Sequence, residues 1–492
     1  MSEGTMSAPL WTFDEFITAM RGRPTGTTAP AIEGISIDSR TLAVGDAFFA
    51  IRGEALDGHD YVGKAAAQGA ALAVIAEDRL AALGRLTLPL VVVSDVLSAL
   101  EALGRAARAR TAARIAAITG SVGKTTTKEM LARVLGASGP THFSPASFNN
   151  HWGVPLTLAR MPAQSQFGVF ELGMNHAGEI TRLVAQVRPH VAIITTIAPA
   201  HAAFFEDGVA GIARAKAEIF SGIEPGGAAI LNRDNPQFEP LALMAIDASV
   251  ERVFGFGEAA DCEARLTALD LLPDRSKVRA EILGRKIAFS IGAPGRHLVW
   301  NALAVLLATE LLGGDLQAAA DSLGTMSAPG GRGARHTLQL AAGTALLIDD
   351  SYNANPTSMG AALAVLAAAA PGPGGRRIAV LGDMLELGAD ELALHAGLVE
   401  PLVAAGVDLV FLAGSRMAAL EAVLPSAMRG HYAERAEALD AILETTLADG
   451  DVVMVKGSKG SRMTPLVERL LARYSGPVAE GPGVATPIEG QG

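Results

Sequence analysis

The sequence predicts an α/β fold built from several domains, and three observations support this prediction. Residues 335–478 alternate strand-like and helix-like segments, which is the pattern of a mostly parallel sheet covered by helices on both faces. Near residue 120, a β-branched run leads through a glycine-bounded loop into a helix. Hydrophobic residues make up 50% of the chain but aromatic residues only 5%, which favours close packing of helices on sheets. The length of 492 residues gives room for about three domains.

Residues 1–110 are predicted to form a small α/β domain. The expected elements are a helix at Trp11–Met20, strands at Gly34–Arg40 and Ala47–Ile51, a helix at Tyr61–Gly69 and a strand at Ala70–Ala76. Ser36, Ser39 and Arg40 offer hydroxyls and a guanidinium that could hold a pyrophosphate. A solvated strand end is the alternative reading, and residue types alone favour it.

Residues 111–328 contain the most specific motif, the stretch from Gly120 to Thr126 with the sequence Gly-Ser-Val-Gly-Lys-Thr-Thr. Gly120 and Gly123 let backbone N–H groups approach phosphate oxygens, and the helix expected at Thr125–Leu135 directs its positive end to the same anion. Lys124 adds a charge for the terminal phosphates, Ser121 and Thr126 flank it, and the Thr125 hydroxyl suits Mg²⁺. Ile118 stands where the long form of this motif has its first glycine. The motif predicts a nucleotide-phosphate site; a plain strand-turn-helix with a surface lysine is the alternative.

Other polar residues of this segment admit two readings each. Asn149 and Asn150 lie in a turn-rich loop that carries either function or a simple Asx turn. Glu171 ends an apolar strand, where ligands of open α/β sheets bind, so we predict a Mg²⁺ ligand rather than a cap. His201 follows a buried strand and Lys216 lies in a helical stretch. Residue types alone favour a structural role for His201 and a solvated position on the helix face for Lys216.

The remainder of this segment is predicted to contain small added strands around 250–290 and an apolar helix at Val299–Leu312. His297 stands at the start of that helix and Asn301 lies within it. Side chains at such a position can reach phosphates or a base, or can serve as caps.

A Gly-rich stretch at Pro329–Gly333 reads as a hinge, and residues 329–478 as a third domain. We expect strands at 345–348, 377–381, 407–412 and 451–455, and helices at 357–369, 391–404, 416–423 and 462–473. Polar clusters follow these strands at Asp349–Pro356, Gly382–Asp383 and Lys456–Lys459, where such folds bind ligands. The segment has no G-x-G-x-x-G, so no dinucleotide site is expected. The tail at 479–492 is predicted to be disordered.

The net charge of −11 argues against nucleic acid or an anionic membrane as a partner. The single cysteine, Cys262, excludes an internal disulfide and suits a reducing compartment. Apolar runs such as Met359–Ala370 are too short to span a bilayer, and the N-terminus lacks the features of a signal peptide. A cytoplasmic protein without membrane insertion is expected.

Taken together, these stretches resemble the Mur ligase family over nearly the whole chain. The most specific matches are the strings Thr119–Met130, Glu171–Asn175, Asp349–Pro356, Gly382–Gly388 and Lys456–Ser458. The strings Ser351–Pro356 and Gly382–Gly388 point to the branch that joins D-alanyl-D-alanine to a UDP-N-acetylmuramoyl-tripeptide. The resemblance implies an N-terminal domain for the UDP-sugar substrate, a central P-loop ATPase-type domain and a C-terminal Rossmann-like ligase domain.

The resemblance also implies an activity and its cofactors. The family consumes ATP to activate a carboxylate as an acyl phosphate, which an amine then attacks. ATP and Mg²⁺ are therefore expected as cofactors, with a second Mg²⁺ and a carbamylated Lys216. The expected partners are UDP-N-acetylmuramoyl-tripeptide and D-alanyl-D-alanine, with no nucleic acid and with the chain as a monomer. The alternatives are another Mur-type or folylpolyglutamate-type amide ligase, or a regulatory P-loop NTPase.

By the same resemblance, Lys124, Glu171, His201 and Lys216 are the expected catalytic residues, and Thr125, Glu171, His201 and Lys216 the metal ligands. The residues implied at ATP are Gly120, Ser121, Gly123, Lys124, Thr125, Thr126, His297, Asn301, Arg332 and Asp350. Those implied at the substrates are Ser36, Ser39, Arg40, Asn149, Asn150, Asn353 and Asn355. Two departures stand out: Ala146-Ser147 where relatives often have Gly-Asn, and Leu298 where Asn is common.

Overall fold

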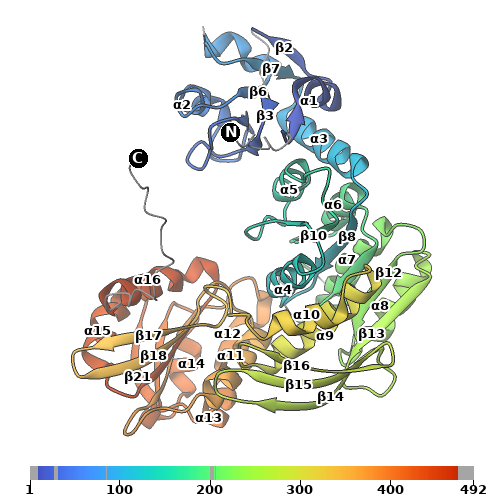
Figure 1. Cartoon of the computed structure of the whole chain (residues 1–492). Helices are drawn as coiled ribbons and strands as arrows, with labels where there is room; N and C mark the ends of the chain where they lie inside the picture. The colour runs from blue at the N-terminus through green and yellow to red at the C-terminus, as the bar shows by residue number, and fades with distance from the viewer. Residues whose placement is uncertain (1–8, 27–30, 85, 200–203, 206, 475–492) are drawn as a thin grey trace, which may run out of the picture. The chain divides into compact units, whose positions relative to one another are not determined.

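The computed structural model of the chain describes every residue except 1–8, 27–30, 85, 200–203, 206 and 475–492 (Figure 1). It divides into two compact units, Met1–Met326 and Ser327–Gly492, which we describe separately. The predicted tail at 479–492 lies outside the described residues. No helix among the described residues is long and apolar enough to cross a membrane.

The first unit begins with a five-stranded sheet in the order β2-β7-β6-β5-β4. Its strands are β2 (Arg23–Thr25), β4 (Gly34–Ser36), β5 (Asp46–Phe49), β6 (Leu72–Ala76) and β7 (Leu90–Val93). All neighbours are parallel except β2 and β7. Around it lie the small pair β1 (Trp11–Thr12) and β3 (Ala31–Ile32), and the helices α1 (Phe13–Met20), α2 (Val62–Ala67) and α3 (Val96–Arg110). α3 leads from this sheet into the next one (Figure 1).

The predicted elements of this region differ from the observed ones at their ends, and two of these differences have a clear local cause. The strand expected at Gly34–Arg40 ends at Ser36, because the Ser36 hydroxyl donates to the Asp38 carbonyl and accepts from the Asp38 N–H, which turns the chain. The helix expected from Trp11 begins at Phe13. There, Thr12 and Glu15 form a capping box that closes the first turn.

The central part of the first unit is a nine-stranded sheet in the order β16-β15-β14-β13-β12-β11-β8-β10-β9. The parallel strands are β8 (Arg114–Thr119), β9 (Thr141–Phe143), β10 (Phe167–Glu171), β11 (Val191–Ile194), β12 (Ala228–Asn232), β13 (Arg252–Gly257) and β14 (Ala264–Leu271). Antiparallel β15 (Ser276–Ile282) and β16 (Arg285–Ile291) extend it and confirm the small strands predicted around 250–290.

Helices cover this sheet on its faces. They are α4 (Lys124–Gly136), α5 (Gly153–Ala159), α6 (Glu179–Val187), α7 (Gly208–Ala217), α8 (Phe238–Asp247), α9 (Arg296–Leu311) and α10 (Leu316–Leu323). Strand β8 is buried except at Arg114 and lies between β10 and β11, so its carboxyl end opens at the middle of the parallel sheet. α4, α9 and α10 pack together beside it (Figure 1).

The second unit contains a six-stranded sheet in the order β17-β18-β22-β19-β20-β21. Its strands are β17 (Ala334–Leu340), β18 (Gly343–Asp350), β19 (Arg377–Gly382), β20 (Leu409–Ala413), β21 (Arg429–Ala433) and β22 (Val452–Lys456), and only the β17–β18 pair is antiparallel. Its helices are α11 (Pro356–Ala368), α12 (Glu391–Ala396), α13 (Val399–Ala404), α14 (Ala418–Val423), α15 (Leu439–Thr446) and α16 (Met463–Tyr474). Two separate apolar clusters line this sheet, which confirms the predicted parallel sheet with helices on both faces.

The helix predicted over Glu391–Ala404 is wrong as a single element. It is split into α12 and α13, with Gly397 and Leu398 between them. β17 and β21 were not predicted, because each lies at an edge of the sheet and carries mainly polar residues.

Candidate functional site

The Gly120–Lys124 loop has the geometry that its sequence predicts. Gly120 has a φ of +150° and Gly123 a φ of +86°, both in the region that favours glycine. A Cβ on Gly120 would collide with the Thr195 hydroxyl, and one on Gly123 would lie 3.0 Å from Asn301 Oδ1. α4 begins at Lys124, so its N-terminal N–H groups face the loop. The strand, loop and helix thus form a concave ring of backbone donors that suits phosphate.

The loop is tied to the chain that follows β11. The Ser121 N–H donates to the Thr196 carbonyl at 2.8 Å, and the Ser121 hydroxyl donates to the Ala198 carbonyl at 2.9 Å. The Thr195 hydroxyl donates to the Val122 carbonyl at 2.6 Å. Thr195 was not predicted as a site residue. Its signal was the pair of threonines at the carboxyl end of the strand next to β8. These hydrogen bonds fix the backbone conformation of the loop.

Glu171 lies on the strand next to this loop. It ends β10, pairs in register with Ile118 of β8, and is only 2% exposed. Oε1 accepts a hydrogen bond of 2.7 Å from Asn149 Nδ2, whereas Oε2 is buried without a hydrogen-bond partner in the described residues. A buried carboxylate oxygen without a donor is costly unless a cation meets it. The site therefore fits a metal ion bound beside the phosphates.

Of the other three predicted metal ligands, the structure describes Thr125 and Lys216 but not His201. Thr125 is buried in the first turn of α4, with its hydroxyl 3.2 Å from the Ser147 hydroxyl. His201 lies outside the described residues, so its predicted role stays a prediction. Among the residues that the structure describes, no group of three His, Cys, Asp or Glu side chains is arranged to hold a metal. Besides Glu171 and Thr125, a cation here would take further oxygens from the nucleotide or from water.

Lys216 is buried, not solvated. It lies on α7 as predicted, with 1% of its surface exposed, so the solvated position that residue type alone favoured is wrong. Burial, together with the charge of Lys124, brings the pKa of the Lys216 amine well below its usual value. Burial therefore favours the neutral form of the amine, which is the nucleophilic one.

α9 brings a further predicted residue to the loop. Asn301 is buried and its amide lies against Gly123, whereas His297 stands exposed in the first turn. Asn235, which was not predicted, donates through Nδ2 to Thr196 Oγ1 at 3.0 Å and to the Ile197 carbonyl at 2.9 Å. Its contacts join the end of β12 to the chain behind the phosphate loop.

The three residues predicted to bind the UDP-sugar lie close together, at the end of β4 and in the turn that follows it. Ser36 and Ser39 are buried, while Arg40 is exposed and pairs with Asp38, Nη2 to Oδ2 at 2.7 Å. The hydrogen bond from Arg40 lowers the pKa of Asp38. The structure brings these side chains together, although Arg40 is engaged within the turn.

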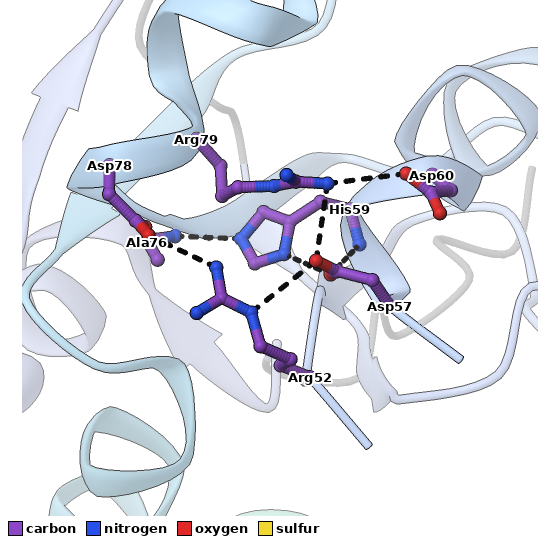
Figure 2. Close-up of polar contacts among 7 residues, drawn as sticks. All are labelled: Arg52, Asp57, His59, Asp60, Ala76, Asp78 and Arg79. Atoms are coloured by element: carbon purple, nitrogen blue, oxygen red, sulfur yellow. Dashed lines mark hydrogen bonds and ion pairs between the residues drawn. The ribbon is translucent and has the colours of Figure 1, made fainter. Parts of the chain in front are cut away.

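Figure 2 shows a network that fixes the neighbouring loop of residues 52–57. His59 is 2% exposed; its Nδ1 lies 2.6 Å from Asp57 Oδ1, and its Nε2 accepts the Ala76 N–H at 2.9 Å. Arg52 and Arg79 both pair with Asp57 Oδ2, at 3.4 and 3.2 Å. The loop reaches the Asn149–Asn150 region, since a Cβ on Gly53 would lie 3.1 Å from the Trp152 ring.

Asn149 and Asn150 point to different partners. Asn149 contacts Glu171, as described above. The Asn150 side chain accepts the N–H groups of Trp152 and Gly153, at 3.2 and 2.9 Å, which is the Asx turn left open by the sequence.

The predicted residues of the second unit lie near the carboxyl end of β18. Lys456 Nζ donates to Asp350 Oδ2 at 2.8 Å and to the Asn353 carbonyl at 2.9 Å. The Arg332 guanidinium lies over the Tyr352 ring at 4.2 Å. Asn355 caps α11 in a capping box with Ser358. Their approach to ATP or to substrate stays a prediction.

A phosphate loop at the carboxyl edge of a parallel sheet, with a carboxylate on the next strand, defines a nucleotide-phosphate-binding α/β protein. Family sequence models match three segments: the Mur ligase family catalytic domain at residues 31–111, the Mur ligase middle domain at 118–309, and the Mur ligase glutamate ligase domain at 335–459. The chain belongs to the Mur ligase family, and its fold is the three-part α/β architecture predicted from the sequence.

Individual relatives are similar over most of the chain. The UDP-N-acetylmuramoyl-tripeptide–D-alanyl-D-alanine ligase of Escherichia coli (strain K12) is 35% identical over 89% of this chain and 94% of that protein. The protein of the same name from Bacillus subtilis (strain 168) is 33% identical over 89% of this chain and 93% of its own length. A crystal structure of MurF from Acinetobacter baumannii gives a TM-score of 0.81 at 32% identity, and covers 94% of this chain and 99% of that one.

Proposed function

We propose that this chain is an ATP-dependent amide ligase that joins D-alanyl-D-alanine to UDP-N-acetylmuramoyl-tripeptide in peptidoglycan precursor synthesis. The curated relatives that carry this name match about nine-tenths of the chain. The observation that carries the chemistry is the buried Oε2 of Glu171, on the strand beside the phosphate loop, which has no hydrogen-bond partner among the described residues. A carboxylate there supports cation-assisted phosphoryl transfer.

The reaction starts from two anions that repel each other, a substrate carboxylate and the γ-phosphate of ATP. The carboxylate oxygen attacks the γ-phosphorus and forms an acyl phosphate, and ADP leaves with the electrons of the broken P–O bond. The backbone N–H groups of Gly120 and residues 122–124, the N-terminus of α4 and Lys124 stabilise the phosphate charge. Thr125 and Glu171 would hold Mg²⁺, which when bound would neutralise the transferred group.

The second step forms the amide. The neutral amine of D-alanyl-D-alanine attacks the acyl carbon, loses a proton and expels inorganic phosphate. The acyl phosphate must be protected from water. We propose that the second unit closes over the phosphate loop through Pro329–Gly333, and that ATP binds before the amine substrate.

The substrate assignments rest on the clusters described above. Ser36, Ser39 and Arg40 are proposed at the UDP moiety and Asn149 and Asn150 at the muramoyl-peptide, with Asn353 and Asn355 completing the substrate set. His297, Asn301, Arg332 and Asp350 are proposed to contact ATP. We also propose that the enzyme is a monomer in the cytoplasm, which size-exclusion chromatography with light scattering and cell fractionation would test.

We further propose that Lys216 carries a carbamate and, with His201, holds a second Mg²⁺. The neutral amine of Lys216 attacks the carbon of CO₂ and loses a proton, which creates a carboxylate at its tip. Its burial and lowered pKa support this reaction. Mass spectrometry under bicarbonate should find one added CO₂ in the wild type and none in Lys216→Arg; an equal mass change in both proteins would contradict the proposal.

A coupled phosphate-release assay tests the function as a whole. Phosphate release should require UDP-N-acetylmuramoyl-tripeptide and D-alanyl-D-alanine together with ATP. Release that is unchanged by both substrates would identify a regulatory NTPase instead. Release that responds only to other acid and amine substrates would identify a different ligase of the same type.

A further inference from the structure

Lys128 is a buried cation that the proposed reaction does not use. It lies on α4, three residues after Thr125, and its side chain is fully buried. Its ammonium donates to the Ser144 carbonyl at 2.6 Å and to the Ala146 carbonyl at 3.1 Å, and pairs with Glu129 Oε1 at 2.7 Å. These partners satisfy the three N–H donors of an ammonium group. Because a buried charge is costly unless it is fully paired, the segment at 144–146 is held firmly against α4.

That segment continues into residues that touch both proposed metal ligands. The Ser147 hydroxyl lies 3.2 Å from the Thr125 hydroxyl, and Asn149 Nδ2 donates to Glu171 Oε1 at 2.7 Å. The Asn149 carbonyl also accepts the Gly173 N–H at 2.8 Å, so the segment bridges α4 and the chain after β10. We call residues 144–149 the bridging segment.

The bonds of the bridging segment set how the ligands are oriented. Asn149 occupies Oε1 of Glu171 and leaves Oε2 for a cation, while Ser147 restricts the rotation of the Thr125 hydroxyl. Groups that orient metal ligands in this way change metal affinity when they are lost. Lys128 holds the start of the segment, so its removal would loosen both contacts together.

We propose that Lys128 is a positioning residue, which fixes the bridging segment so that Thr125 and Glu171 are prearranged for a metal-nucleotide complex. This inference rests on one part of the proposed function, namely that the phosphate loop binds a nucleotide together with a metal ion. Ser147, one of the positions where the sequence departs from the family resemblance, belongs to this arrangement.

Lys128→Met tests the proposal, because methionine keeps the unbranched apolar part of the side chain and removes the charged amine. Arg108→Met is a matched control, since Arg108 is also a buried cation and donates to the Val187 and Arg188 carbonyls, both at 2.8 Å. Those carbonyls lie at the C-terminal end of α6, near the start of β8, whereas the phosphate loop follows the end of that strand. The readouts are Mn²⁺ affinity by electron paramagnetic resonance, with a non-hydrolysable ATP analogue bound, and Tm.

Lys128→Met should weaken Mn²⁺ affinity by about tenfold or more, whereas Arg108→Met should lower Tm and leave that affinity near the wild-type value. Equal Mn²⁺ affinity in Lys128→Met and wild type would overturn the proposal, and so would an equal loss in both variants. If Lys128→Met does not fold, Ser147→Ala and Asn149→Ala decide the matter. Each should weaken Mn²⁺ binding, and unchanged affinity in both would also overturn the proposal.

The same measurement separates this inference from the proposed function. Mn²⁺ and nucleotide binding require neither the acid nor the amine substrate. A wild-type protein that binds the metal-nucleotide complex but forms no amide would contradict the ligase and leave the role of Lys128 intact.

Discussion

At the scale of single residues, the site depends on buried polar groups that have most, but not all, of their hydrogen-bond partners. Asn149 satisfies one oxygen of Glu171 and leaves the other without a partner among the described residues. Lys216 has a lowered pKa because it is buried. A cation or a substrate gains the most binding energy where it meets a buried polar atom that lacks a hydrogen-bond partner next to a phosphate loop.

Glu171→Gln should abolish activity without unfolding the protein. The glutamine carbonyl can still accept the hydrogen bond from Asn149, but its amide nitrogen cannot bind a cation. We expect kcat to fall by about a hundredfold or more, with Tm close to that of the wild type. Steady-state kinetics and thermal melts check this prediction; activity within a few-fold of wild type would contradict the metal-ligand role.

Lys124→Ala should also remove activity while the fold stays intact. Lys124 contributes charge toward the phosphates and donates from Nζ to the Gly120 carbonyl at 2.8 Å. The hydrogen bonds of Ser121 and Thr195 still hold the loop when that side chain is removed. Turnover and ATP affinity are the measurements, with circular dichroism as the control for folding. Turnover at the wild-type level would refute the assignment of the phosphate loop.

His190 should make stability depend on pH. Burial, with the charges of Arg114 and Arg108, lowers the pKa of His190 to about 4, and its Nδ1 accepts the Ile115 N–H at 2.9 Å. Because the unfolded chain takes up this proton near pH 6.5, stability is complete above that pH and falls as the pH drops toward about 4.

His190→Asn keeps an acceptor near the Ile115 N–H and removes the titrating group. Its Tm should fall less than the wild-type Tm between pH 7 and pH 4. Thermal melts across that range provide the test, and parallel pH profiles for the two proteins would show that His190 does not contribute.

At the scale of elements, local sequence patterns predicted the strands, loops and helices that depend on residues close together in the chain. The β-branched run, the glycines and the Lys-Thr pair were enough to predict β8, its loop and α4. Glu171 was predicted because it ends an apolar strand. The contacts made by Ser147, Thr195, Asn235 and Lys128 were not predicted, because they join segments that are distant along the chain. The edge strands β17 and β21 were missed because polar residues dominate them.

Asn355 provides a test at this scale. Its side chain accepts the Ser358 N–H at 2.9 Å and caps α11. Asn355→Ala should lower stability by about 1 kcal/mol, whereas Asn355→Asp should retain the cap. If the amide also contacts substrate, Asn355→Asp should raise KM at unchanged Tm. Equal stability of Asn355→Ala and wild type in denaturant titrations would contradict the capping role.

At the scale of the whole molecule, the chain combines a first unit that contains the phosphate loop with a second unit that has its own sheet. The second unit has apolar clusters on both faces of that sheet. Residues 327–492 expressed alone should therefore fold with a single cooperative thermal transition. The absence of cooperative unfolding, measured by circular dichroism, would show that this unit depends on the rest of the chain.

The central claim is that the chain activates a carboxylate as an acyl phosphate. The most direct test uses UDP-N-acetylmuramoyl-tripeptide whose terminal carboxylate carries a heavy oxygen isotope. Acyl-phosphate formation predicts that one labelled oxygen appears in the inorganic phosphate for each amide formed, as measured by mass spectrometry. Phosphate without the label, released while the amide product forms, would contradict the account.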